Sequence, residues 1–303
     1  MSHRKKSWFK TQLLLLFIFS SFVLIGASSH TPYQDIIAAV KKGSLSEVQR
    51  ALIAGKNLNL NEPINDEVSL TILHIAAGKY GNFPDSTAIC RALITAGADK
   101  NALDIDAFTP LSHAIYYSNK PVIQTLLQAG ADPNKGAAMG DALRLATEKG
   151  QLDIIELLIS AKVDVKGKKG GSALSLAAQN GNIEIIKELI RAGASLKYVD
   201  SANNTALHSW SHNGTHDLEA LRLLLSNGAN VNAPNKWKQT PIMLMLTSEN
   251  DVSLERLLPA LKILIEAGAD LMTKSDYGDS AMSLGLRNSR PEVVELIKAA
   301  TAK

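Results

Sequence analysis

The sequence predicts an all-α solenoid, built from one helix pair repeated along the chain. A motif first seen at Thr71–Ala77 (TILHIAA) returns at intervals close to 33 residues. A glycine-containing turn of the Ala-Gly-Ala-Asp type follows each copy at a nearly constant distance, and apolar residues at helical spacing lie between the two. A fixed period of this length indicates stacked units that bury their apolar faces against one another.

Two marks measure the repeat, the apolar residue of the first motif and the glycine of the turn. The first mark falls at Leu73, Leu111, Leu143, Leu174, Leu207, Ile242 and Met282. The second mark falls at Gly97, Gly130, Gly193, Gly228 and Gly268, with Lys162 in its place once. The first mark precedes the second by 19 residues in three units, and the second precedes the next first mark by 14 residues in four cases. We interpret the longer intervals as insertions into a 33-residue frame.

Each position of the frame has a predicted local role. The residue two before the first mark carries a short side-chain oxygen that suits a helix N-cap: Thr71, Thr109, Asp141, Ser172, Thr205, Thr240 and Ser280. Small residues such as Ala76 and Ala77 let a short first helix pack closely. Apolar residues at helical spacing over 183–190 predict a second helix, and the following glycine suits the left-handed residue that ends a helix.

These residues resemble the ankyrin repeat, whose pattern is Thr-Pro-Leu-His, then Ala-Ala, Gly, Leu-Leu and Gly-Ala-Asp. The resemblance covers residues 33–303 and recurs seven times. It implies that each unit is a helix pair with a β-turn finger, and that the units stack into a curved palm with a row of fingers. It also implies a protein-binding module that is not an enzyme and uses no cofactor.

The repeat divides the chain into predicted parts. Residues 30–59 form a degenerate N-terminal unit with helices over 33–42 and 45–54, residues 69–279 hold six units, and residues 280–303 form a C-terminal capping unit.

Residues 1–29 differ from the rest and predict a secretory signal peptide. Four basic residues within positions 4–10 precede an apolar run over 13–25, and small residues follow at 26–29. The run spans thirteen residues at ~1.5 Å each, which falls short of the ~30 Å core of a bilayer. We therefore expect an exported protein, periplasmic in a bacterium or secreted. An uncleaved anchor in the inner membrane and a cytosolic protein remain as alternatives.

The charge balance depends on this leader. The chain has 32 Lys+Arg and 29 Asp+Glu, and residues 1–29 hold four of the basic residues and none of the acidic ones. The formal net charge of the remainder is therefore 28 − 29 = −1. A basic surface, the main argument for nucleic-acid binding, is thus not expected. We expect a monomer that binds a protein partner, and contact with a membrane only if the leader is retained.

Cys90 is the only cysteine, which excludes an intrachain disulfide. It occupies a position filled by Ile or Leu in other units, so we predict a buried apolar role. An exported domain without disulfides fits a bacterial periplasm better than the eukaryotic exterior.

The Gly167–Ser172 stretch invites a phosphate-loop interpretation, but the order of its residues is wrong. We predict instead that its glycines form a finger turn and that Ser172 is an N-cap. We expect no catalytic residues.

His208, His212 and His216 are spaced four apart, with Asp217 beside them, and are weak candidates for a zinc site. A metal-binding or enzymatic role for this cluster is therefore an alternative to a protein-binding module. However, His208 occupies the histidine position of the repeat, as His74 does. The resemblance implies a structural hydrogen bond between units at that position, so we expect no metal.

Departures from the frame point to function or to strain. Insertions lie around 79–85 and 248–253, and are either tolerated drift or partner contacts. Trp210 and Met245 replace a small alanine, so the stack must open or reshape there. Lys162 replaces glycine at the left-handed position, which costs on the order of 1 kcal/mol.

In proteins of this kind, partners meet the finger tips and the inward first helices. The corresponding residues are Ile105, Asp106, Phe108, Tyr116, Tyr117, His212, Asn213, Trp237, Gln239 and Tyr277. Five of the chain's 15 aromatic residues fall in this set, and aromatic side chains along a groove are typical of a binding hot spot. The alternative is that some of them pack between fingers.

Overall fold

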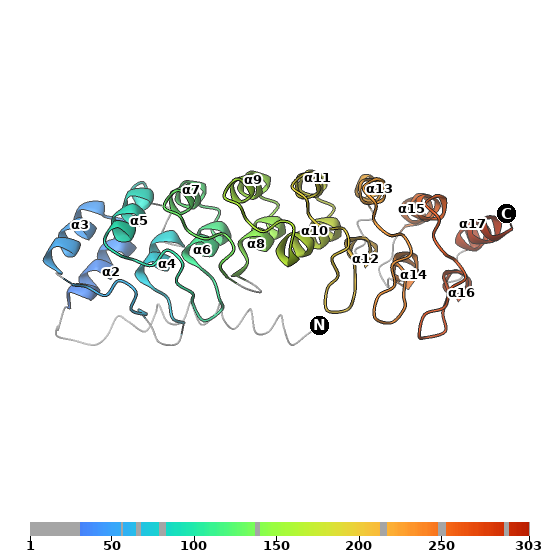
Figure 1. The fold of residues 1–303 in the computed structure, drawn as a ribbon, viewed down its shortest axis with the longest axis horizontal. Helices are drawn as coiled ribbons and strands as arrows, with labels where there is room; N and C mark the ends of the chain where they lie inside the picture. The colour runs from blue at the N-terminus through green and yellow to red at the C-terminus, as the bar shows by residue number, and fades with distance from the viewer. Residues whose placement is uncertain are drawn as a thin grey trace.

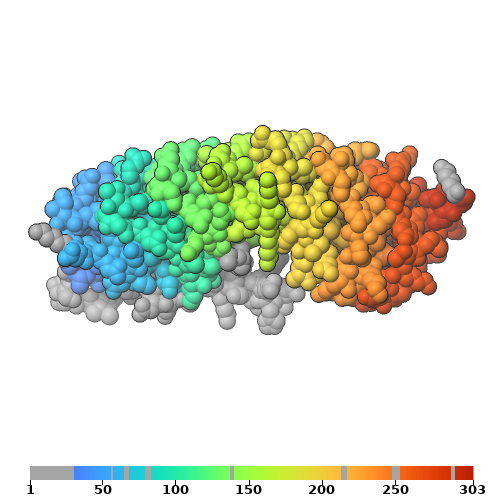
Figure 2. Space-filling view, viewed as in Figure 1, coloured from blue at the N-terminus to red at the C-terminus, as the bar shows by residue number. Residues whose placement is uncertain are grey.

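The structure is a computed structural model. It describes residues 31–55, 57–64, 68–78, 83–136, 140–212, 217–247, 253–287 and 291–302. The predicted leader, most of both insertions, Asn213 and His216 lie outside these ranges. Figures 1 and 2 show an elongated, gently curved body in which consecutive units follow one another along the long axis.

The described residues form two rows of helices and no strand. The inner row is α2 (Pro32–Lys42), α4 (Ile72–Ala77), α6 (Pro110–Tyr116), α8 (Ala142–Glu148), α10 (Lys168–Asn180), α12 (Ala206–His212), α14 (Pro241–Thr247) and α16 (Ala281–Arg287). The outer row is α3 (Leu45–Ala54), α5 (Ser86–Thr95), α7 (Lys120–Gln128), α9 (Leu152–Ser160), α11 (Ile183–Arg191), α13 (Leu218–Ser226), α15 (Leu254–Glu266) and α17 (Pro291–Thr301). Among these helices, none combines the length and the apolar character that crossing a membrane would require.

Packing between neighbours forms one continuous core. Most inner helices contact their outer partner and the neighbouring inner helices, as α6 contacts α4, α7 and α8. The first-mark residues from Leu73 to Leu174 are buried. Cys90 is also fully buried, as predicted, and burial raises the pKa of its thiol to about 12. The predicted helices over 33–42 and 45–54 are confirmed as α2 and α3.

Most of the predicted N-caps are confirmed. Thr109 Oγ1 accepts the N–H of Ser112 at 3.1 Å, and Asp141 Oδ1 accepts the N–H of Arg144 at 2.9 Å. Thr240 precedes α14 as expected, but its buried hydroxyl has no hydrogen-bond partner.

The prediction for Ser172 was wrong, because α10 begins four residues earlier at Lys168 and has Gly167 as its N-cap. The chain between Lys162 and Leu174 is two residues shorter than the 14-residue spacing of the frame, so too little chain is available for a finger. Gly170 lies so close to Val165 that a Cβ would collide with the carbonyl oxygen of Val165. The glycines therefore form the first turn of a helix, not a finger turn.

The bulky replacements in the inner row are accommodated inside the core. Trp210 is fully buried, and its Nε1–H donates to the carbonyl of Asp217 at 2.9 Å. Met245 is 2% exposed. Helix α12 still contacts α10 and α14, so the stack reshapes around both side chains and stays closed.

A row of asparagines links the turns of successive units, and we call it the asparagine ladder. In each case the side-chain oxygen accepts the backbone N–H that opens the next turn, at 2.6–2.8 Å: Asn61 to Asp99, Asn101 to Asp132, Asn134 to Asp164 and Asn232 to Asp270. These bonds run along the stack and fix the register of one unit on the next.

The left-handed position after the outer helices α5, α7, α9, α11, α13 and α15 is confirmed, whereas Gly55 after α3 has φ −91°. Lys162 has φ +64°, in the region that the equivalent Gly130 and Gly193 also adopt. A side chain at this φ is strained, because its Cβ crowds the backbone.

Lys162→Gly should therefore raise the free energy of unfolding by about 1 kcal/mol. The measurement is the urea midpoint. Lys135→Gly is the matched control, because Lys135 is an exposed lysine outside the positive-φ set and glycine there should only destabilise. Equal effects of the two substitutions would contradict the assignment of strain.

Trp210→Ala restores the residue that the repeat favours at this position, yet it should destabilise the protein by about 3–5 kcal/mol. The reason is that the surrounding core has formed around the indole and cannot fully close the cavity. Thermal unfolding checks this, and a variant as stable as the parent would show that the units relax freely.

Candidate partner-binding groove

Four finger turns share one local design. The first residue of the turn uses a side-chain oxygen to accept backbone N–H groups within the turn, and its own N–H donates to the carbonyl four residues later. This residue is Asp104, Asp200, Asn235 or Ser275, with N–H···O distances of 2.8–3.0 Å for the four backbone bonds. The sequence folds this way because short oxygen-bearing side chains mimic a backbone turn.

Neighbouring fingers are joined through their backbones. Ile105 N–H donates to Val68 at 3.3 Å, Lys236 N–H to Ala202 at 2.9 Å, and Asp276 N–H to the Trp237 carbonyl at 3.0 Å. The loops that carry these bonds hang below the inner helices (Figure 1).

Predicted partner residues at the finger tips are exposed. Ile105 and Tyr277 are each 64% exposed, and Asp106 is also on the surface. Trp237 is half-buried, and the Nζ of Lys236 lies 4.2 Å from the centre of its ring. Trp237 and Tyr277 stand on fingers that are joined by the Asp276–Trp237 backbone bond, and we call the two the C-terminal aromatic patch.

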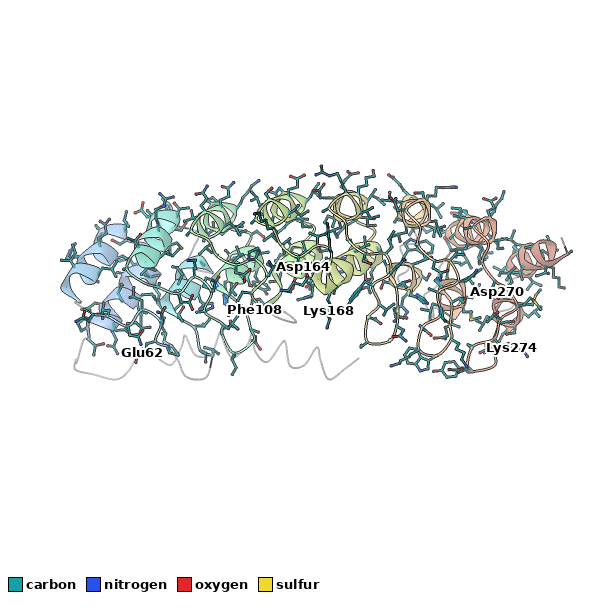
Figure 3. All side chains as sticks on the ribbon, viewed as in Figure 1. Glu62, Phe108, Asp164, Lys168, Asp270 and Lys274 are labelled. Carbon is teal, nitrogen blue, oxygen red and sulfur yellow. The ribbon has the colours of Figure 1, made fainter. Side chains whose placement is uncertain are left out.

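Three other predicted aromatics meet at α6. The ring centres of Phe108 and Tyr116 are 6.5 Å apart, and those of Tyr116 and Tyr117 are 5.1 Å apart, both edge to face. The Nζ of Lys149 lies 4.8 Å from the Tyr116 ring. All three aromatics are half-buried. We call this group the N-terminal aromatic cluster, and Phe108 is labelled in Figure 3.

Sequence reasoning missed the pair that supports this cluster. His113 Nε2 lies 2.8 Å from Asp104 Oδ2, and the His113 ring stacks edge to face on Phe108 at 5.6 Å. Burial acts to raise the pKa of Asp104, but the hydrogen bond and charge of His113 outweigh it and lower that pKa. The recurring residue with a short side-chain oxygen at the start of each of these fingers was the available signal. For Asp106, burial and the nearby Asp104 charge raise the pKa.

His74 and His208 make the predicted bonds between units. In each, Nδ1 accepts the N–H of the preceding threonine at 3.1 Å, so the proton is on Nε2, which donates to a carbonyl of the next unit at 3.1 Å. Burial lowers the pKa of both, and together with the nearby His113 charge it lowers the pKa of His74 to about 4.

The remaining predicted residues are scattered. His212 is exposed at the end of α12. Gln239 is used inside its finger, where its carbonyl accepts from His208 Nε2 and its side-chain oxygen from Asn235 Nδ2. Both ring nitrogens of His208 are engaged, so binding a metal at either nitrogen would break a hydrogen bond that the fold uses. Within the described residues no cluster of His, Cys, Asp and Glu suits a metal ion, and His216 lies outside them.

Comparison with known proteins decides the family. A family model described as ankyrin repeats (3 copies) matches residues 36–137 and 143–235, which is more than half of the chain. The chain belongs to the ankyrin-repeat family. Ankyrin repeats are generally protein–protein interaction modules, and the helix pairs and fingers described above are their structural units.

Similar proteins occur in animals and fungi. The ankyrin repeat protein nuc-2 of Neurospora crassa is 30% identical over 136 residues, which are 44% of this chain and 12% of that protein. The B-cell lymphoma 3 protein homolog of Mus musculus is 27% identical over 270 residues, 88% of this chain and 50% of that protein. The ankyrin-repeat chain thus spans half or less of the length of these relatives.

A solved structure shares the fold. The ankyrin repeat domain of human ASB11 superimposes with a TM-score of 0.58 at 24% identity, covering 74% of this chain and 96% of that one. The predicted all-α ankyrin-repeat solenoid is therefore confirmed.

Acid should weaken the ankyrin stack through His74. The unfolded chain protonates this residue near pH 6.5, whereas in the folded chain it stays neutral down to about pH 4. Its stabilising effect is therefore complete above pH 6.5 and is lost as the pH falls from 6.5 through about 4, at a cost of at most about 3 kcal/mol. Urea midpoints measured between pH 7.5 and 4 check this.

The matched variant is His74→Gln, which removes the titrating ring. The gap in stability between the parent and this variant should narrow as the pH falls. If the stabilities of the parent and of His74→Gln change in parallel across the whole pH range, the prediction is wrong.

Proposed function

We propose that this chain is an exported, non-enzymatic module that holds one protein partner along its concave groove and finger tips. The observation that carries this proposal is the pairing of two aromatic groups, the N-terminal aromatic cluster and the C-terminal aromatic patch, on the inward face and fingers of one stack. Large aromatic side chains supply most of the binding free energy in many protein interfaces.

The fingers that carry the C-terminal aromatic patch are held by backbone hydrogen bonds, so the exposed parts of its side chains are not needed to form the turns. Tyr277 is 64% exposed, on a finger whose turn is already stabilised by Ser275 and Gly278 backbone bonds. Trp237 contributes its backbone groups to its finger and to the next one, and its half-buried ring contacts the exposed Lys236. Side chains that the local structure does not use remain available to a partner.

The groove is organised before binding. The N-terminal aromatic cluster is fixed by His113 and Lys149, and the fingers are fixed by backbone bonds to one another. A partner therefore orders few groups when it docks, which lowers the entropic cost of association.

The basic start and short apolar run of residues 1–29 support export through a secretory route, to the periplasm or the exterior. We propose that the ankyrin-repeat domain acts there as a monomer after the leader is removed. N-terminal sequencing of the protein recovered from outside the cytoplasm should begin near residue 28 or 30. A protein that still begins at residue 1 would instead indicate a tether to the membrane.

A photo-crosslinking amino acid at Trp237, Tyr117 or Tyr277 should trap the same partner protein in the native compartment. The same group placed at Ile53, a 78% exposed residue on outer helix α3, is the matched control and should trap nothing in common with them. The trapped partner can then be purified for direct binding measurements.

With that partner, Tyr117→Ala and Trp237→Ala should each weaken binding by at least ~10-fold, since hot-spot residues contribute about 2 kcal/mol or more. Helicity should be unchanged in both variants, and Ile53→Ala should bind normally. Lost helicity would show that these aromatics serve packing. Unchanged affinity would show that the partner binds at another surface of the protein.

A further inference from the structure

The asparagine ladder is interrupted at two consecutive junctions in the middle of the chain. Lys166 and Lys197 occupy the ladder position in the two units where asparagine is missing. The N–H groups that the ladder would bind belong to Ser195 and Asn230. Within the described residues, no side chain accepts a hydrogen bond from either of them, while the four other junctions keep their bonds.

A second set of links between units is weakened at the same place. His74 and His208 each bond to a carbonyl of the following unit, and Ser112 Oγ does the same to the Gly140 carbonyl at 2.6 Å. Ser175 on α10 occupies the equivalent position, but its hydroxyl is buried and has no partner in the described structure. The link from α10 to the following unit is therefore missing.

The row of fingers has a gap there as well. Helix α10 begins at Lys168 and takes up the residues that form a finger elsewhere. No loop hangs beneath α10 in Figure 1, and Figure 3 places Lys168 in this gap. The backbone bonds between fingers join Val68 to Ile105 on one side and the fingers from Ala202 onward on the other.

Apolar packing remains at this position. Helix α10 contacts α8 and α12, and Gly171 lies so close to Tyr198 that a Cβ would collide with its ring. Apolar contact depends on buried area and is not directional, whereas a hydrogen bond fixes distance and angle. The interface of α10 and α11 with α12 and α13 keeps its apolar packing, and one polar side-chain link across it among the described residues is the exposed Lys187–Glu219 ion pair at 3.1 Å. Long, exposed charged side chains fix distance and angle poorly, so this interface resists separation but tolerates small rotations.

We propose that the junctions around α10 and α11 form a hinge that divides the solenoid into two blocks, residues 31–164 and 195–302. In a stack where each unit contacts only its neighbours, the junction with the fewest links is where the array bends or opens first. The N-terminal aromatic cluster and the C-terminal aromatic patch lie on opposite sides of this hinge. On the proposed function, the hinge therefore sets the spacing between the two halves of the groove.

The experiment restores the ladder with Lys166→Asn and Lys197→Asn together. Lys135→Asn with Lys274→Asn is the matched control, since both lysines are exposed in the same connecting segments but do not occupy the ladder position. In the restored variant, hydrogen exchange at the Ser195 and Asn230 amides should slow about 5-fold, as expected for one added hydrogen bond each. The urea midpoint should also rise, and the control should change neither.

Spin labels at Leu103→Cys and Met272→Cys report the hinge itself, because these exposed residues stand on either side of it and Cys90 is fully buried. The distance distribution between the labels should be broad in the parent and narrower in the restored variant. Equal widths, or unchanged exchange in the restored variant, would overturn the hinge. No partner is present in these measurements, so they remain valid if the proposed function fails.

Discussion

The structure depends on the contact between each helix pair and its neighbours. A single unit, such as α6 with α7, is too small to enclose a core, so the buried faces of Leu111 and Ile123 are covered by the units on both sides. Repetition of one packing solution then extends the core from Ile36 to Ile297 without a boundary. A chain built in this way offers an extended binding surface, which is better suited to holding another protein than to enclosing a small substrate.

Polar links add direction to this packing. Buried histidines with a fixed proton position, ladder asparagines and joined finger backbones each tie one unit to the next at a defined distance. They also explain why residues that resemble metal ligands or catalytic groups in the sequence have structural roles in the fold. His208 resembles a metal ligand by spacing, yet both of its nitrogens are already used. The units where such links are absent are consequently as informative as those where they are present, because their geometry depends more on apolar packing and on exposed ion pairs such as Lys187–Glu219.

Much of the fold could be predicted because the same residue types recur at equivalent positions in several units. The bounds of α2, α3 and α11, the buried Cys90 and the left-handed Lys162 all followed from comparing the units with one another. The candidate site was predictable only in part. The aromatics of the groove were found by their positions in the frame, but the Asp104–His113 pair was not, since it joins a finger to the helix that follows it. Ser172 was misassigned because a spacing shorter by two residues converts a finger into a helical turn.

The sequence by itself determined that this is a stacked helical repeat, with its units, its register and the positions facing the groove, because period and local residue chemistry depend on neighbours along the chain. Only the tertiary structure decided which side chains meet across units. Whether Tyr116 is covered by Lys149, whether Trp210 fits inside the stack and whether a lysine can take the place of an asparagine all depend on distances between segments some 30 residues apart. Those distances are set by packing in three dimensions, and no single unit contains them.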